Sequence, residues 1–170
     1  MKGFLLPIAI ALTVNSFAQT PIPPQKPVLV MTEVGEVAGA NDKIAVSVSC
    51  RIEPKSISPT IKIADMAMAG GKFDIDITIA AGLAKLIDEA SQKLLAGEVF
   101  SGKAGIANVS VVEAKGQKTV SIKFDREGLS FSRDTLELDA DNAASLARII
   151  GRAKQISDWL TPKLTALQPH

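Results

Sequence analysis

The chain is poor in the side chains on which most enzyme sites depend. Its 170 residues include no tyrosine, and histidine, cysteine and tryptophan occur once each. The histidine is His170, the last residue, so a Ser-His-Asp or Cys-His arrangement would have to use the end of the chain. No histidine and cysteine cluster has the spacing of a zinc site. We therefore expect a protein without catalytic residues, metal or cofactor.

An excess of charge of one sign is also lacking. The sequence has 19 lysine and arginine residues against 18 aspartate and glutamate residues. This balance is typical neither of a basic nucleic-acid binder nor of an acidic tail. Disulfides are excluded within the chain, because Cys50 is the single cysteine. Cys50 alternates in phase with Val46 and Val48, which predicts a small buried residue rather than a reactive thiol.

The N-terminal segment has the layout of a bacterial signal peptide. Lys2 precedes the apolar run Phe4–Val14, and a small-x-small pattern ends at Ala18. The run is too short to span a bilayer, which requires about 20 apolar residues. We expect residues 1–18 to be removed before Gln19, leaving no transmembrane segment. Residues 19–27 form a proline-rich linker, either a spacer or simply the start of the mature domain.

An internal duplication organises the remainder of the chain. Residues 80–90 and 143–153 share six of eleven amino acids at an offset of 63 positions. The same offset aligns Val46–Val48 with Val109–Val111 and FDID (Phe73–Asp76) with LELD (Leu136–Asp139). The set also includes Met66 and Met68 with Leu129 and Phe131, and, across a two-residue gap, Ile61–Ile63 with Ile122–Phe124. Two copies suggest a pseudo-twofold domain rather than a solenoid.

Each unit contains several strands followed by one helix. Apolar and polar residues alternate in segments that predict strands at Val28–Val37, Ile44–Ile52, Lys72–Ile75, Lys118–Asp125 and Gly128–Ser132. Glu98–Phe100 is a further, degenerate candidate strand. Short connections make the sheets antiparallel. The predicted fold is α+β, with two ββββα units at residues 28–97 and 98–170 whose antiparallel sheets pack on two helices.

The helices have one apolar face each and recognisable ends. The apolar faces contain Leu83, Leu86, Ile87, Ala90 and Leu94 in the first helix, and Leu146, Ile149, Ile150, Ala153, Ile156 and Leu160 in the second. Each face is expected to pack against the sheet of its own unit and against the other helix. Asp76 and Asp139 are predicted N-caps, and Asp141 follows in a first turn. Pro162 is predicted to mark the end of the second helix.

The polar phase of the strands supplies a candidate contact face. It consists of Ser47, Ser49, Arg51, Lys62, Ser121 and Lys123. The carboxylate pairs Asp74/Asp76 and Glu137/Asp139 are better explained by solvation and capping than by catalysis. The segment GEVFSGKA (Gly97–Ala104) lacks the hydroxyl residue of a phosphate loop and follows a helix, so a linker with Gly97 as C-cap is expected.

The segment LELDADNAASL (Leu136–Leu146) carries a family resemblance. It is similar to the strand-to-helix signature I-S-L-T-x-E-Q-W-x-x-L of the positive-cofactor-four and Whirly-type single-stranded-DNA-binding fold, with Ala143 in place of tryptophan. The resemblance implies a unit of four strands and a helix that is used twice, and an activity on single strands. Such binding requires aromatic platforms, but Phe73, Phe124 and Phe131 fall on the apolar phase.

We therefore predict an exported, non-catalytic binding or envelope-assembly domain that is periplasmic or secreted in a bacterium. Its partner would be an envelope protein or an extracellular ligand. One alternative is a single-stranded nucleic-acid-binding protein on a Whirly-like scaffold. A more distant alternative is a hydrolase that uses the carboxylate pairs named above.

Overall fold

A computed structural model describes residues 27–53, 55–67, 70–114, 116–125 and 134–166. The predicted signal peptide, most of the predicted linker, Phe131 and the predicted strand Gly128–Ser132 lie outside these residues. Within them, two four-stranded antiparallel sheets and two helices form the ββββα–ββββα arrangement expected from the sequence. The predicted fold class is confirmed.

The first sheet has the strand order β1-β2-β3-β4. Its strands are β1 (Val28–Ala38), β2 (Lys43–Glu53), β3 (Ser56–Asp65) and β4 (Lys72–Asp76). On one face, alternate β2 residues Val46, Val48 and Cys50 are fully buried. This confirms the buried position of Cys50, and the burial raises the pKa of its thiol because the thiolate is less well solvated there.

The second sheet has the strand order β5-β6-β7-β8. Its strands are β5 (Ser101–Ala104), β6 (Ala107–Ala114), β7 (Gln117–Phe124) and β8 (Thr135–Leu138). The first strand therefore begins at Ser101, and its prediction at Glu98–Phe100 was wrong. Gly97, with a φ of 73°, lets the helix end in a Schellman turn in which the Glu98 amide donates to the Lys93 carbonyl. Because Glu98 still belongs to this turn, the pairing of β5 with β6 begins only at Ser101.

The strand registers refine the internal duplication. Val46 pairs with Ile63 in the first sheet, and Val109 pairs with Ile122 in the second. Ile63 is therefore the equivalent of Ile122, and the predicted two-residue gap must be enlarged to four residues. The physical reason is a longer β2–β3 hairpin in the first unit. As a result, Lys62 corresponds to Ser121 rather than to Lys123.

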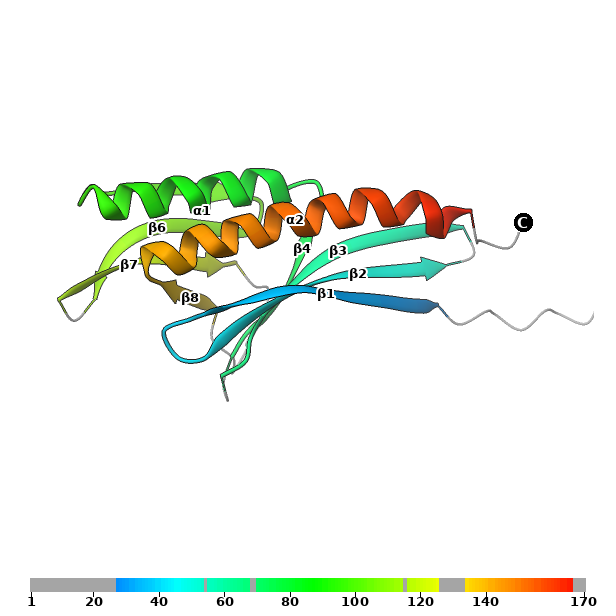
Figure 1. The fold of residues 1–170 in the computed structure, drawn as a ribbon, viewed down its shortest axis with the longest axis horizontal. Coiled ribbons are helices and arrows are strands. Elements are labelled where there is room, and N and C mark those ends of the chain that lie inside the picture. Colours follow the sequence, from blue (N-terminus) through cyan, green and yellow to red (C-terminus); the bar gives the residue numbers. More distant parts are fainter. Residues whose placement is uncertain (1–26, 54, 68–69, 115, 126–133, 167–170) are drawn as a thin grey trace, which may run out of the picture.

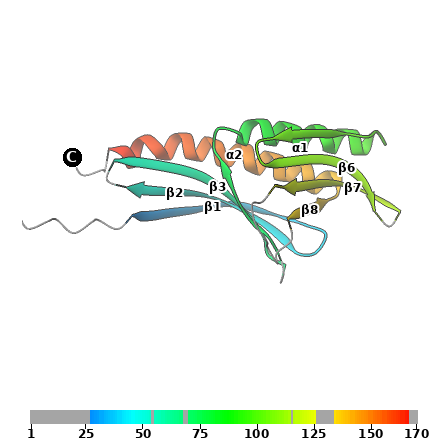
Figure 2. The same cartoon turned by 180° about the vertical axis from the view of Figure 1, so that it is seen from behind.

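The two helices are exchanged between the units (Figures 1 and 2). Helix α1 (Ala80–Leu95) contacts β5, β6 and β7, whereas α2 (Ala140–Thr165) makes its main sheet contacts with β1, β2 and β3. The expectation that each helix covers the sheet of its own unit was wrong. The helices also pack on each other in antiparallel directions, and the buried Ser91 hydroxyl donates to the Ala140 carbonyl at 2.9 Å.

Two glycines allow the exchanged helices to approach the sheets closely. Gly35 pairs with Val46, and Gly102 pairs with the repeat-equivalent Val109. A Cβ atom on Gly35 would lie 3.3 Å from Cδ1 of Ile149 in α2, and one on Gly102 would lie 2.8 Å from Cδ2 of Leu86 in α1. Because Leu86 and Ile149 are also repeat-equivalent, the same contact occurs twice, each time between different units.

A single apolar core joins the two halves. The predicted helix residues Leu83, Ile87, Leu146 and Ile150 are fully buried in it. Phe73 of β4 stacks on Phe124 of β7 with ring centroids 3.9 Å apart, which connects the two sheets directly. Both phenylalanines are therefore core residues, as their phase predicted.

The helix ends match the predictions only in part. Asp139 is the N-cap of α2 and accepts from the Asn142 amide at 2.7 Å, with Asp141 in the first turn. Asp76 is not a cap, because α1 begins after Ile79. Instead, Asp76 accepts from the amide and the hydroxyl of Thr78, at 2.8 and 2.7 Å. These hydrogen bonds lower the pKa of Asp76.

Pro162 lies inside α2 rather than at its end, so this prediction was also wrong. The helix continues for three residues to Thr165. Proline removes one backbone donor from the helix. The last turn is held by Leu164, which is 8% exposed, and by the Ala166 amide, which donates to the Pro162 carbonyl at 3.2 Å.

Candidate contact surface

The first sheet has one face covered by α2 and an opposite, open face. Strand register places alternate residues of all four strands in rows across this open face. Glu33, Ser47, Lys62 and Asp74 form one such row, in which each residue is paired with the next. The adjacent row is Glu36, Ala45, Ala64 and Lys72. Short alanines in the middle strands therefore lie between longer side chains on the outer strands.

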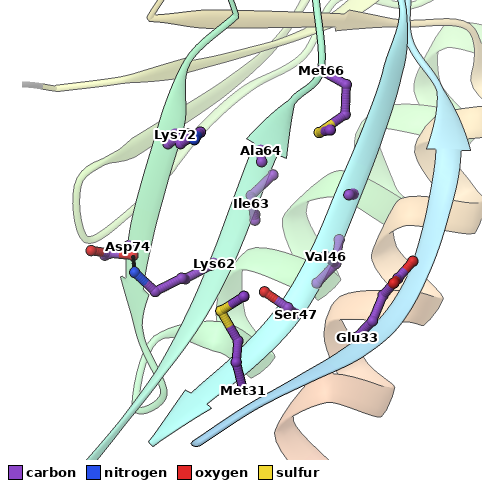
Figure 3. Close-up of a pocket in the computed structure, with 11 residues that line it drawn as sticks. Met31, Glu33, Val46, Ser47, Lys62, Ile63, Ala64, Met66, Lys72 and Asp74 are labelled. Atoms are coloured by element: carbon purple, nitrogen blue, oxygen red, sulfur yellow. Dashed lines mark ion pairs between the residues drawn. The ribbon is translucent and has the colours of Figure 1, made fainter. Parts of the chain in front are cut away.

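A groove of about 630 Å³ follows from this arrangement. Figure 3 shows Met31 and Met66 at its two ends, with Ala64 between them. Both methionines are largely exposed, at 60% and 58%. The complete lining consists of Met31, Glu33, Ala45, Val46, Ser47, Lys62, Ile63, Ala64, Met66, Lys72 and Asp74. The volume is in the range of small-ligand sites, which likewise combine an apolar lining with a few polar groups.

The rim of the groove is charged on both sides. Lys62 Nζ of β3 lies 3.1 Å from Asp74 Oδ1 of β4, and Figure 3 shows this ion pair reaching across the two strands. The pair is partly exposed and contributes at most about 1 kcal/mol to stability. Because the ion pair is weak, a ligand could bind the ammonium or the carboxylate group with little loss of protein stability. Glu33 adds a carboxylate on β1, at the opposite side of the groove.

The six predicted contact residues fall in three places. Ser47 and Lys62 line the groove. Arg51 lies further along β2, exposed and paired with Glu53 at 2.8 Å. Ser49 is only 2% exposed, because it lies between its cross-strand partners Met31 and Thr60, and it offers little surface for contact. Ser121 and Lys123 belong to β7 of the second sheet.

The open face of the second sheet is arranged differently. Lys103 Nζ and Asn108 Nδ2 both donate to Asp125, at 2.8 and 3.0 Å. These two hydrogen bonds, that from Lys103 first, lower the pKa of the Asp125 carboxyl. Lys103, Asn108 and Lys123 are cross-strand neighbours. Two polar groups of this row are therefore bound to Asp125 at the end of β7, whereas the middle of the first sheet is hollowed by alanines.

Sequence reasoning missed the residues that shape the groove. Met31, Ala45, Ala64 and Met66 are apolar or small residues, and none of them was among the predicted contact residues. A bulge between Glu33 and Gly35 shifts the phase of β1, so the alternation of that strand is obscured. Two alanines in the polar phase of β2 and β3 were the available indication of a hollow.

The residues proposed for metal or carboxylate chemistry lie apart or have other partners in the structure. No group of three or more histidine, cysteine, aspartate or glutamate side chains that could hold a metal ion occurs in the described part of the chain. Asp74 is paired with Lys62, and Asp139 caps α2. Ser101–Ala104 of the segment GEVFSGKA is strand β5 rather than a phosphate loop. Over the same described ranges, neither helix is long and apolar enough to cross a membrane.

Comparisons with known proteins find little similarity. No family model matches the sequence, and no curated protein matches it. Among solved structures, the chain is similar to one from work on mutations in SsgB that correlate to longitudinal cell division during sporulation of Streptomyces coelicolor. The two are 15% identical, with 79% of this chain and 93% of that chain covered and a TM-score of 0.31. At this similarity we transfer neither fold nor function.

Proposed function

We propose that the protein is an exported, non-catalytic binding or envelope-assembly domain, and that the open face of its first sheet is the contact surface. The observation that carries the proposal is the groove lined by Met31, Ala45, Ala64 and Met66. Exposed methionines adapt to different apolar partners, and the Lys62–Asp74 pair at the rim offers both charges. An extended segment of an envelope protein fits this chemistry.

The single-stranded nucleic-acid alternative has less support from this face. Base stacking requires exposed aromatic rings beside a basic groove. Phe73 and Phe124 are buried against each other, and the groove has acidic as well as basic residues. A salt-titrated binding assay with an oligonucleotide would distinguish the two functions.

Export is tested by expressing the full chain in a Gram-negative bacterium, fractionating the cells and measuring the intact mass. We expect a periplasmic product that begins at Gln19. A cytoplasmic product that retains residues 1–18 would contradict export without affecting the binding proposal.

The contact surface is tested by photo-cross-linking from Ser47 in cells of the native host. The matched control carries the same cross-linker at Ser110, the repeat-equivalent residue on the second sheet. We expect a discrete adduct from Ser47 only, and its loss when Ala64→Trp fills the groove. Equal adducts from both positions, or adducts that survive Ala64→Trp, would contradict this surface.

A further inference from the structure

We infer that the outward face of α2 is a second contact surface, and that it binds an anionic membrane. The surface, called the basic stripe below, consists of Arg148, Arg152, Gln155, Trp159 and Lys163, all of them exposed. Successive members are three or four residues apart and therefore follow one line along the helix. At 1.5 Å per residue the stripe is about 22 Å long.

Within the residues that the structure describes, the cations of the basic stripe have no carboxylate partner. In the described part of the chain, neither Arg148, Arg152 nor Lys163 forms a salt bridge; all six pairs use other cations. The nearby Asp158 is already paired with Lys154 at 2.7 Å. Like charges four residues apart, such as the two arginines, destabilise a helix by a few tenths of a kcal/mol. An anionic partner offsets this repulsion.

The two arginines border a place for a phosphate group. A shallow hollow of about 260 Å³ is lined by Ser145, Arg148, Ile149 and Arg152. Arg148 is oriented by its own helix, because Nη2 donates to the Ser145 hydroxyl at 3.0 Å. A guanidinium can bind phosphate through two parallel hydrogen bonds. Two of them one turn apart fit the phosphate of a lipid headgroup.

Trp159 favours a membrane over a soluble acidic partner. It is the only tryptophan of the chain and is 63% exposed, with the Lys163 ammonium 4.5 Å from its ring centroid. Tryptophan rings are enriched at membrane–water interfaces, and lysine stems reach past them to the headgroups. The stripe is the convex outer side of a helix, which suits a planar surface better than a peptide.

The position of the stripe leaves room for this contact. The C-terminal part of α2 extends past α1 and lies over the first sheet (Figure 1). The α1 carboxylates Asp88 and Glu89 lie close in sequence to Ser91, which contacts Ala140 at the N-terminal end of α2. They are therefore far from the C-terminal end of the stripe, where Trp159 and Lys163 lie. Because α2 covers one face of the first sheet and the groove lies on the other, membrane binding would leave the groove accessible.

The test uses Trp159 fluorescence of the purified protein with phosphatidylcholine vesicles, with and without phosphatidylglycerol. We expect a blue shift and quenching by brominated lipid only with the anionic vesicles, and reversal by salt. Basic residues near an anionic surface contribute about 1 kcal/mol each, so the variant R148Q/R152Q/K163Q should partition about a hundredfold more weakly. The control K55Q/K85Q/K118Q removes the same charge from other exposed positions and should retain binding.

Three results would overturn the inference. The first is an unchanged emission spectrum with anionic vesicles. The second is an equal loss of binding in the two triple variants, which would indicate an effect of net charge alone. The third is tighter, salt-dependent binding to oligothymidylate that the stripe variant abolishes, which would identify the stripe as a nucleic-acid surface.

Discussion

The first half of the chain has the longer strands, and the second half has the longer helix. Strands β1, β2 and β3 contain 11, 11 and 10 residues and precede a 16-residue helix. Strands β5, β6 and β7 contain 4, 8 and 8 residues and precede a 26-residue helix. Because the helices are exchanged, the long helix covers the long sheet. The strands of each half are thus matched in length to the helix of the other half, so neither half is a complete structural unit.

The largest expected effect comes from separating the halves. We expect residues 28–97 and residues 98–166 each to be unfolded when produced alone, because each sheet then lacks the helix that covers it. Mixing the fragments should restore the far-ultraviolet circular dichroism and the dispersed amide spectrum of the intact chain. The control is the intact chain cleaved at an engineered site beside Gly97, which should remain folded. A folded isolated half would show that the exchange is not required.

A smaller effect is expected from equivalent core residues of the two helices. Ile87 and Ile150 are both fully buried. Ile87→Ala and Ile150→Ala should each lower the free energy of unfolding by about 2–5 kcal/mol. In urea both variants should unfold in one transition, since the halves share a core. Leu95→Ala, at a side chain that is 74% exposed, is the control. Two separate transitions in either variant would contradict a shared core.

The paired glycines give a finer comparison. In Gly102→Ala the new Cβ would lie 2.8 Å from Leu86, so we expect a loss of about 1 kcal/mol as the leucine shifts. In Gly35→Ala the nearest atom is 3.3 Å away, and the reduced entropy of the unfolded chain offsets most of the crowding. Thermal unfolding of both variants would show whether Gly102→Ala is the less stable of the two. A larger loss of stability in Gly35→Ala than in Gly102→Ala would show that α2 packs more tightly on β1 than α1 does on β5.

The smallest effects concern one carboxylate in each half. The pKa values of Asp76 and Asp125 are both held below their ordinary value of 3.8. Each therefore contributes stability that is present above pH 3.8 and is lost as the pH falls through the lowered value. Asp76→Asn and Asp125→Asn should lower the urea midpoint slightly at pH 7 and converge with the unmodified protein in acid. A midpoint difference that persists in acid would assign the effect to packing.

The fold plan could be predicted from the sequence because its periodic patterns are local. The alternation in Ile44–Ile52 and the helix repeat at 80–90 and 143–153 both correspond to observed elements. The helix exchange could not be predicted in this way. Leu83 and Leu146 bury the same kind of surface whichever sheet they meet, so no local pattern distinguishes the two arrangements.

The groove was predictable only where polar residues border it. Ser47 and Lys62 were predicted as contact residues from the polar phase of their strands, and both line the groove. The hollow between them depends on Ala45 and Ala64 becoming neighbours, which is set by strand register rather than by either segment. The bulge after Glu33 then puts Met31 and Glu33 on the face opposite to Gly35 and Val37, and a bulge is not visible in alternation alone.

The exchange of helices also has a consequence during synthesis. The apolar face of the first sheet, with Val46, Val48 and Ile61, is covered by residues 140–165, which are synthesised, and would be exported, only after nearly all of the second half. Until then this face has no cover, and contacts between such distant segments form slowly. A chain that stops before Ala140 would leave the apolar face of the first sheet exposed to chaperones and proteases. The last helix thus determines when the whole chain becomes native.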